Sequence, residues 1–226
     1  MGTDGRSAEV RQRKRFLVAR EDQAVFLREQ GYSDVHAVGL PLIYQHPSSL
    51  PRREGTLLVM PVHSLAYTEH AWNFEQYADE ITAIRGYFRD LVVCVHPSCW
   101  QRGYWVDAFR QRGFTVIRGA SFRDARAYER LAAILGQVEC VTSNGFGSHL
   151  VYASFFGAKP SIYGTLARLQ AQDFASIALY QRHPQMLEQV LALHAEVSLR
   201  EEFPQLFVEP WFCLLYTSDA ADEEDS

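Results

Sequence analysis

The sequence predicts an α/β fold built on one doubly wound, mostly parallel sheet, with a short β-α-β segment before it. Three observations support this prediction. Short apolar runs alternate with longer stretches whose apolar residues recur at helical spacing, and several of these stretches end at a glycine. Of the 226 residues, 47% are hydrophobic and 22% are charged, which is ordinary for a globular protein. Such an alternation is typical of a parallel sheet with helices on both faces.

The first predicted elements lie near the amino terminus. The run RFLVA at residues 15–19 predicts a strand. Residues 21–30 begin with two acids and carry apolar side chains at helical spacing, which predicts a helix ended by Gly31. The run VHAVGL at residues 35–40 predicts a second strand. We therefore expect a β-α-β passage within residues 15–45.

The main domain is predicted over residues 55–212, after a flexible basic lead (1–14), the β-α-β passage and a linker rich in proline and serine (46–54). Its expected strands are short apolar runs: 56–62, 91–95, 115–117, 139–142 and 160–163. Its expected helices carry apolar side chains at helical spacing: 71–89, 100–112, 125–135 and 146–156. A glycine follows each of the last three helices and is expected to end it.

Composition excludes several classes of protein. No stretch approaches the roughly 20 uninterrupted apolar residues that a bilayer crossing needs, and the polar, basic start lacks the apolar core of a secretory signal. We therefore expect a cytoplasmic location. Cys94, Cys99 and Cys140 have no CxxC spacing, which indicates reduced thiols and neither a disulfide frame nor a zinc site.

Residues 213–226 (CLLYTSDAADEEDS) fit no expected element, because a short apolar start runs directly into an acidic string. Reverse-translated, the segment resembles the adapter of transposase-based sequencing libraries; a genuine acidic tail is the alternative. We expect it to contact nothing and to be dispensable. Without its five acids, the 27 acidic residues fall to 22, equal to the 22 basic ones. A neutral body predicts no nucleic-acid partner.

Candidate site residues directly follow three of the predicted strands. Open α/β sheets bind ligands at the carboxyl ends of their strands, so these positions are the informative ones. In chain order they are His63 and Ser64, then His96 and Pro97, then Ser143, Asn144, Gly145, Gly147, Ser148 and His149. They supply hydroxyls and imidazoles but no acidic metal ligand, and the body contains no DxD motif. We therefore expect neither a metal nor a cofactor.

The third segment points to a phosphate. Its glycines let an anion approach the backbone, and the amino end of the following helix presents N–H groups. Ser143 and Ser148 add hydroxyl donors. In the alternative interpretation, Ser148 only caps the helix and the glycines only form a tight turn.

The histidines receive separate interpretations. His96 could donate a hydrogen bond to phosphate, with Pro97 fixing its loop, although a histidine followed by proline is a common dipeptide. For His63, a structural role and a binding role are equally supported. We expect the remaining histidines to be structural or surface residues: His36, His46, His70, His183 and His194.

These residues carry a resemblance to a known family. Residues 142–164 (TSNGFGSHLVYASFFGAKPSIYG) resemble the donor-binding region of GT-B glycosyltransferases of polysaccharide biosynthesis. His96, Pro97 and Ser143 resemble the HP and serine motifs of GT-B sialyl- and related transferases, which contact the phosphate and nucleotide of a CMP-sugar. Residues 37–44 (AVGLPLIY) are similar to the segment leaving a GT-B amino-terminal domain. No acid follows the phosphate turn as it does in many of these enzymes; Ser148 and His149 stand near that place.

The resemblance implies a Rossmann-like half of a GT-B enzyme, which binds a nucleotide-sugar donor and transfers the sugar to a hydroxyl of a glycan acceptor. It implies that residues 15–45 end an amino-terminal domain holding the general base, and that residues 55–212 are a truncated donor-binding domain, inactive alone. Such an enzyme could associate peripherally with a membrane through the missing part; nothing indicates its oligomeric state.

Two alternatives stay open. One is a nucleotide-sugar 2-epimerase, whose chemistry needs carboxylates near the sugar; near the strand ends the sequence offers only Glu69 and Asp124. The other is a non-catalytic nucleotide-binding fragment.

Overall fold

The computed structural model describes residues 14–46, 50–63, 70, 72–121 and 124–215, which divide into two compact units between His46 and Pro47. The amino-terminal unit contains β1 (Phe16–Val18), α2 (Glu21–Glu29), β2 (Val35–Ala37) and the 3-10 turn η1 (Pro41–Tyr44). β1 and β2 pair in parallel, with Phe16 opposite Val35. Gly31 adopts φ 88°, the left-handed conformation that suits glycine after a helix. The predicted β-α-β passage is confirmed.

The second unit is built on a parallel sheet of five strands in the order β5-β4-β3-β6-β7. The strands are β3 (Arg53–Val59), β4 (Asp90–Val95), β5 (Thr115–Arg118), β6 (Val138–Ser143) and β7 (Lys159–Ile162). All five predicted strands are present. β3 begins earlier than expected, at Arg53 inside the predicted linker, and ends before Pro61, which has no N–H to donate to a ladder.

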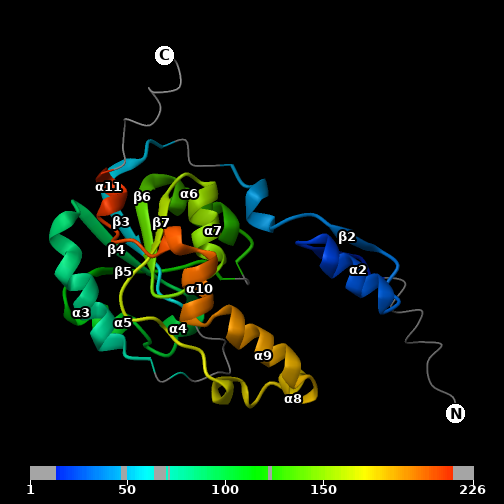
Figure 1. The fold of residues 1–226 in the computed structure, drawn as a ribbon. Coiled ribbons are helices and arrows are strands. Elements are labelled where there is room, and N and C mark those ends of the chain that lie inside the picture. Colours follow the sequence, from blue (N-terminus) through cyan, green and yellow to red (C-terminus); the bar gives the residue numbers. More distant parts are fainter. Residues whose placement is uncertain (1–13, 47–49, 64–69, 71, 122–123, 216–226) are drawn as a thin grey trace, which may run out of the picture. The chain divides into compact units, whose positions relative to one another are not determined.

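Helices cover both faces of this sheet, as predicted for a doubly wound fold. Figure 1 shows α3 (Phe74–Ile84) and α5 (Val106–Gln111) on one side, and α6 (Ala127–Gln137) and α7 (Ser148–Phe155) on the other. The short helix α4 (Pro97–Trp100) follows β4, and the 3-10 turn η2 (Arg85–Tyr87) follows α3. None of the helices in the described ranges has the length and apolar character that a bilayer crossing requires.

The remaining elements follow β7 and are short. In order they are η3 (Ala171–Phe174), α8 (Ala178–Arg182), α9 (Pro184–Leu193), α10 (Glu196–Glu202), η4 (Pro204–Leu206) and α11 (Phe212–Leu215). Pro184 stands at the first position of α9, where its missing N–H costs nothing.

The core lies between the sheet and the α3–α5 layer. Tyr77 of α3 and Phe109 of α5 are fully buried against Leu57 and Val93 of the central strands. Trp105 is 1% exposed and its indole N–H donates to the carbonyl of Val62, 2.9 Å away. Full burial of such a side chain contributes about 1.5–3 kcal/mol. The indole bond also ties the core to the loop after β3.

Several predicted helix boundaries are wrong. The helix expected at residues 100–112 is two helices, α4 and α5, because Gly103 and Trp105 take φ of 75° and 65° between them. Gly136 does not end α6, which continues to Gln137. The helix expected at residues 71–89 is shorter, and its last turn is η2. The helix expected at residues 146–156 begins only at Ser148.

The expectation that residues from Cys213 onward contact nothing is wrong for the first of them. Cys213 lies in α11, is 8% exposed and belongs to the core, and Leu214 packs against it. Lys159 Nζ donates to the carbonyl of Cys213 at 2.5 Å. The apolar start of the segment therefore finds an apolar surface and a donor. Residues 216–226 lie outside the described residues.

Candidate functional site

The sheet order creates a crevice between β3 and β6. From β3 the chain moves outward through β4 and β5, and then returns to place β6 on the other side of β3. The connections after β3 and β6 therefore leave in opposite directions. In open α/β sheets, ligands bind outside the carboxyl ends of the strands at this switch point.

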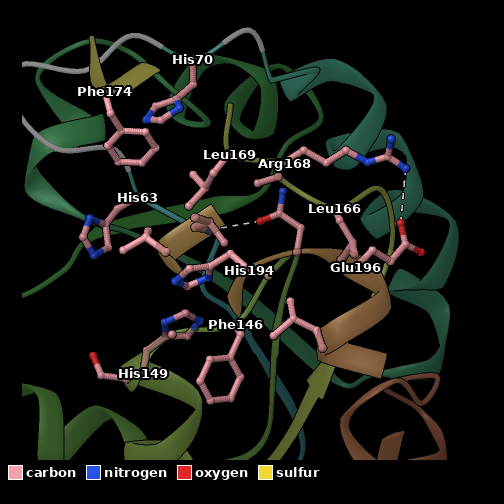
Figure 2. A pocket seen from close by; sticks show the side chains of 18 residues that line it. His63, His70, Phe146, His149, Leu166, Arg168, Leu169, Phe174, His194 and Glu196 are labelled. Carbon is pink, nitrogen blue, oxygen red and sulfur yellow. Dashed lines mark hydrogen bonds and ion pairs between the residues drawn. The ribbon is translucent and has the colours of Figure 1, made fainter. Parts of the chain in front are cut away.

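A cavity of about 270 Å³ lies at this crevice. Its walls come from the loop after β3 (Val62 and His63), the loop after β6 with the start of α7 (144–149) and the loop after β7 (166–169). His194 and α10 add a further wall. Figure 2 shows the rings of His63, His149 and His194 around one space.

A second cavity, of about 370 Å³, lies between the carboxyl ends of β3, β4 and β5 and the helices α6 and α7. Its lining includes His96 after β4, Tyr128 of α6 and Tyr152 of α7. His63, Ser148 and His149 line both cavities. The two spaces therefore adjoin at the start of α7, and a ligand held there can extend into either.

The start of α7 offers backbone donors. Gly147 is the residue before the helix, in extended conformation, and its backbone carbonyl accepts from the N–H of Leu150. The N–H groups of Ser148 and His149 precede any intrahelical partner, and no carbonyl of the described residues accepts from them. A helix amino terminus with open N–H groups attracts anions.

Close packing explains why Gly145 and Gly147 have no side chain. A Cβ at Gly147 would lie 2.8 Å from Nδ1 of His149, and a Cβ at Gly145 would lie 2.7 Å from Cγ2 of Val62. The alternative in which Ser148 caps the helix is wrong, because Ser148 is already the first helical residue.

His96 is held in one tautomer by its neighbours. The backbone N–H of Ser98 donates to Nδ1 of His96 at 3.2 Å, and the Ser98 hydroxyl lies 2.7 Å from the same nitrogen. Because Nδ1 accepts, the proton of the neutral ring is on Nε2. Burial, reinforced by nearby His63, lowers the pKa of His96 to about 4. His96 is therefore a neutral imidazole with an N–H donor on the ring that lines the second cavity.

His63 and His96 form a stacked pair, with ring centroids 4.1 Å apart and planes at 23°. His149 stands close enough to His63 for their charges to interact. Burial first, and His63 second, lower the pKa of His149 to about 3. Its Nε2 is inaccessible and has no hydrogen-bond partner among the described residues.

The other candidates take different positions. Ser143 is fully buried at the end of β6 and lines neither cavity; its hydroxyl has no partner among the described residues. The Asn144 side chain accepts from the N–H of Val62 at 3.0 Å, so it ties two strand ends together. Pro97 is the first residue of α4 and lines neither cavity. Ser64 lies outside the described residues.

Two histidines expected to be structural or surface residues line the first cavity: His70 and His194. Nδ1 of His70 lies 3.0 Å from Oδ2 of Asp173, both side chains are almost fully buried, and the ring stacks on Trp72 at 4.0 Å. The position of His70 in the loop after β3 was a usable signal. No sequence signal pointed to His194, since it reaches the cavity from the end of α9.

Acidic ligands for a cation are scarce here. Within the described residues, no group of three or more His, Cys, Asp or Glu side chains has a metal-binding arrangement. Asp124 lines the second cavity, but it is ion-paired with Arg130 and accepts from the N–H of Arg126. The arrangement favours neutral N–H and O–H donors around an anion.

No protein-family model matches the sequence, and no curated protein sequence matches it. One similar solved structure is a TarM mutant from S. aureus in complex with Fondaparinux, alpha-GlcNAc-glycerol and UDP. The two chains are 9% identical with a TM-score of 0.30, and the similarity covers 85% of this chain and 43% of the other. This chain thus spans less than half of that protein. A likeness this distant carries no argument about function.

Proposed function

We propose that this chain binds a nucleotide-activated sugar at the start of α7 and belongs to a metal-independent, glycosyltransferase-like enzyme of cell-surface polysaccharide synthesis. The observation that carries the proposal is the junction of the two cavities, which His63, Ser148 and His149 all line and where the N–H groups of Ser148 and His149 have no carbonyl partner among the described residues. A phosphate that joins a nucleoside to a sugar has a substituent on each side. The two adjoining cavities suit such a ligand.

The proposed mechanism relies on donors held in place. As the bond between the sugar and the phosphate breaks, negative charge grows on the phosphate oxygens. The N–H groups of α7, the hydroxyl of Ser148 and the Nε2–H of His96 would stabilise that charge without a cation. The glycan acceptor hydroxyl attacks the anomeric carbon. The hydroxyl loses its proton to a general base, which we do not assign to any of the described residues.

Of the described acids that line the two cavities, neither is a free carboxylate for the epimerase alternative: Glu196 is ion-paired with Arg168 and Arg200. Asp124 is engaged by Arg130, and Glu69 lies outside the described residues. A non-catalytic nucleotide-binding fragment would show the same nucleotide binding, so turnover separates it from an enzyme.

The test is nucleotide binding by the full chain. CMP, CDP or UDP should bind weakly but measurably without added metal, by calorimetry or ligand-observed NMR. Ser148→Ala should weaken binding by about 1 kcal/mol, because one hydroxyl donor is lost. Ser154→Ala, in the last turn of the same helix and outside both cavities, is the matched control. If no nucleotide binds, or if Ser148→Ala binds like wild type, the proposal is wrong.

A further inference from the structure

The described residues that line the two cavities offer no unpaired lysine or arginine to balance the charge of a bound phosphate. Among the described lining residues, Arg168 is the only lysine or arginine, and its NH2 group lies 3.3 Å from a carboxylate oxygen of Glu196. Figure 2 shows this pair at the edge of the first cavity. In the second cavity, the charge of Asp124 is opposed by Arg130. The amino end of α7 supplies only a partial positive charge.

Imidazoles are the groups that can supply the missing charge. His63, His96 and His149 surround the junction of the cavities, and a phosphate dianion beside them favours the protonated form of a neighbouring imidazole. The three imidazoles cannot all be protonated at once. With the ring centroids of His63 and His96 4.1 Å apart, a second positive charge is strongly disfavoured, so the three rings together would take up no more than about one proton.

We propose that His63, His96 and His149 act as one unit that takes up a proton when a phosphate dianion binds at the start of α7. This inference rests on the proposed function and adds to it a preference for the dianion. A phosphodiester, as in a nucleoside monophosphate sugar, carries one negative charge, whereas the nucleotide released by transfer carries two. The unit therefore stabilises the leaving nucleotide more than the bound donor, which is the difference that accelerates a reaction.

Other groups face these rings, and each has a different role. In the second cavity they are Cys94, Asp124, Tyr128 and Tyr152. Burial raises the pKa of the Cys94 thiol to about 11 and raises that of Tyr152, so both stay neutral. In the first cavity the facing groups are His70, His194, Arg168 and Glu196. His70 pairs with Asp173, and burial lowers the pKa of His194.

The test is calorimetry of CMP binding to the full chain at pH 7.5 in several buffers that differ in ionisation enthalpy, with no inorganic phosphate. The observed enthalpy should vary with the buffer, with a slope corresponding to uptake of about one proton. Because uptake accompanies binding, Kd should increase by up to about tenfold per pH unit above neutrality. The CMP phosphate, with a second pKa of about 6, is mostly dianionic there.

Variants and a second ligand identify where the proton goes. His63→Asn keeps a polar side chain but cannot be protonated, so the slope should decrease. With His63, His96 and His149 all replaced by asparagine, the slope should fall toward zero and the pH dependence of Kd should flatten. His183→Asn, at a position that lines neither cavity, should leave both unchanged. The methyl ester of CMP, a monoanion, should bind with little proton uptake.

The outcomes are distinguishable. If no nucleotide binds to the wild-type chain, the proposed function and this inference both fall. If CMP binds with zero slope, only this inference falls. It also falls if the slope survives in the variant in which His63, His96 and His149 are all replaced by asparagine, since the proton is then not on these rings.

Discussion

The α3–α5 face of the sheet and the carboxyl edge where α7 begins both bring rings together, but with different chemistry. On the α3–α5 face, Tyr77 and Phe109 meet edge to face, with centroids 6.1 Å apart, inside an apolar core. At the carboxyl edge, His63 and His96 stack around open space, and the buried Nε2 of His149 lacks a partner among the described residues. The first region supplies stability. The second holds the polar groups to which we assign a ligand.

The largest expected effect is on the core side. Phe109→Ala should lower the free energy of unfolding by about 3–5 kcal/mol, because a fully buried ring leaves a cavity. Phe155→Ala, at a position 54% exposed, is the matched control and should change it by less than about 0.5 kcal/mol. Urea unfolding measures both. Equal losses in the two variants would contradict the assignment of the core.

The histidines at the carboxyl edge should make the free energy of unfolding depend on pH. Because the folded pKa values of His96 and His149 are about 4 and 3, below the ordinary 6.5, the unfolded chain takes up protons first as the pH falls. Stability should therefore be intact above pH 6.5 and decline below it, by up to about 1.4 kcal/mol per pH unit for each ring. Unfolding at pH 7 and pH 5 measures this. His149→Asn should reduce the decline; an unchanged decline would show that its burial is not responsible.

The smallest expected change in stability is at the carboxyl edge, at Gly147. Gly147→Ala places a Cβ 2.8 Å from the His149 ring, which must shift. We expect a stability change of at most about 1 kcal/mol, since a side chain can move, but several-fold weaker nucleotide binding. Gly86→Ala, with nothing within 4 Å of the added Cβ, is the control for binding. If both variants bind nucleotide like wild type, the geometry of His149 is irrelevant to the site.

Local patterns predicted the strands well, because each contains a short apolar run, and the runs of the central strands are buried in the sheet. Leu57 and Leu58 in β3 and Val93 in β4 illustrate this. These apolar side chains are almost fully buried in the sheet, and residues near them in the chain could not bury them in another way. Helix ends were harder to predict. The break between α4 and α5 depends on Trp105, whose φ of 65° is imposed where its indole reaches Val62 and the core.

The sequence by itself determined the doubly wound fold, the carboxyl edge of the sheet as the place of interest, and the segments that meet there. Only the tertiary structure decided that His63, His96 and His149 adjoin two cavities, that Ser143 is buried away from both, and that His70 and His194 join the lining. The physical reason is the distance along the chain between the residues that interact. Strand and helix patterns are read within a few residues, whereas a cavity is closed by segments distant in sequence, here the loop after β7 and the end of α9.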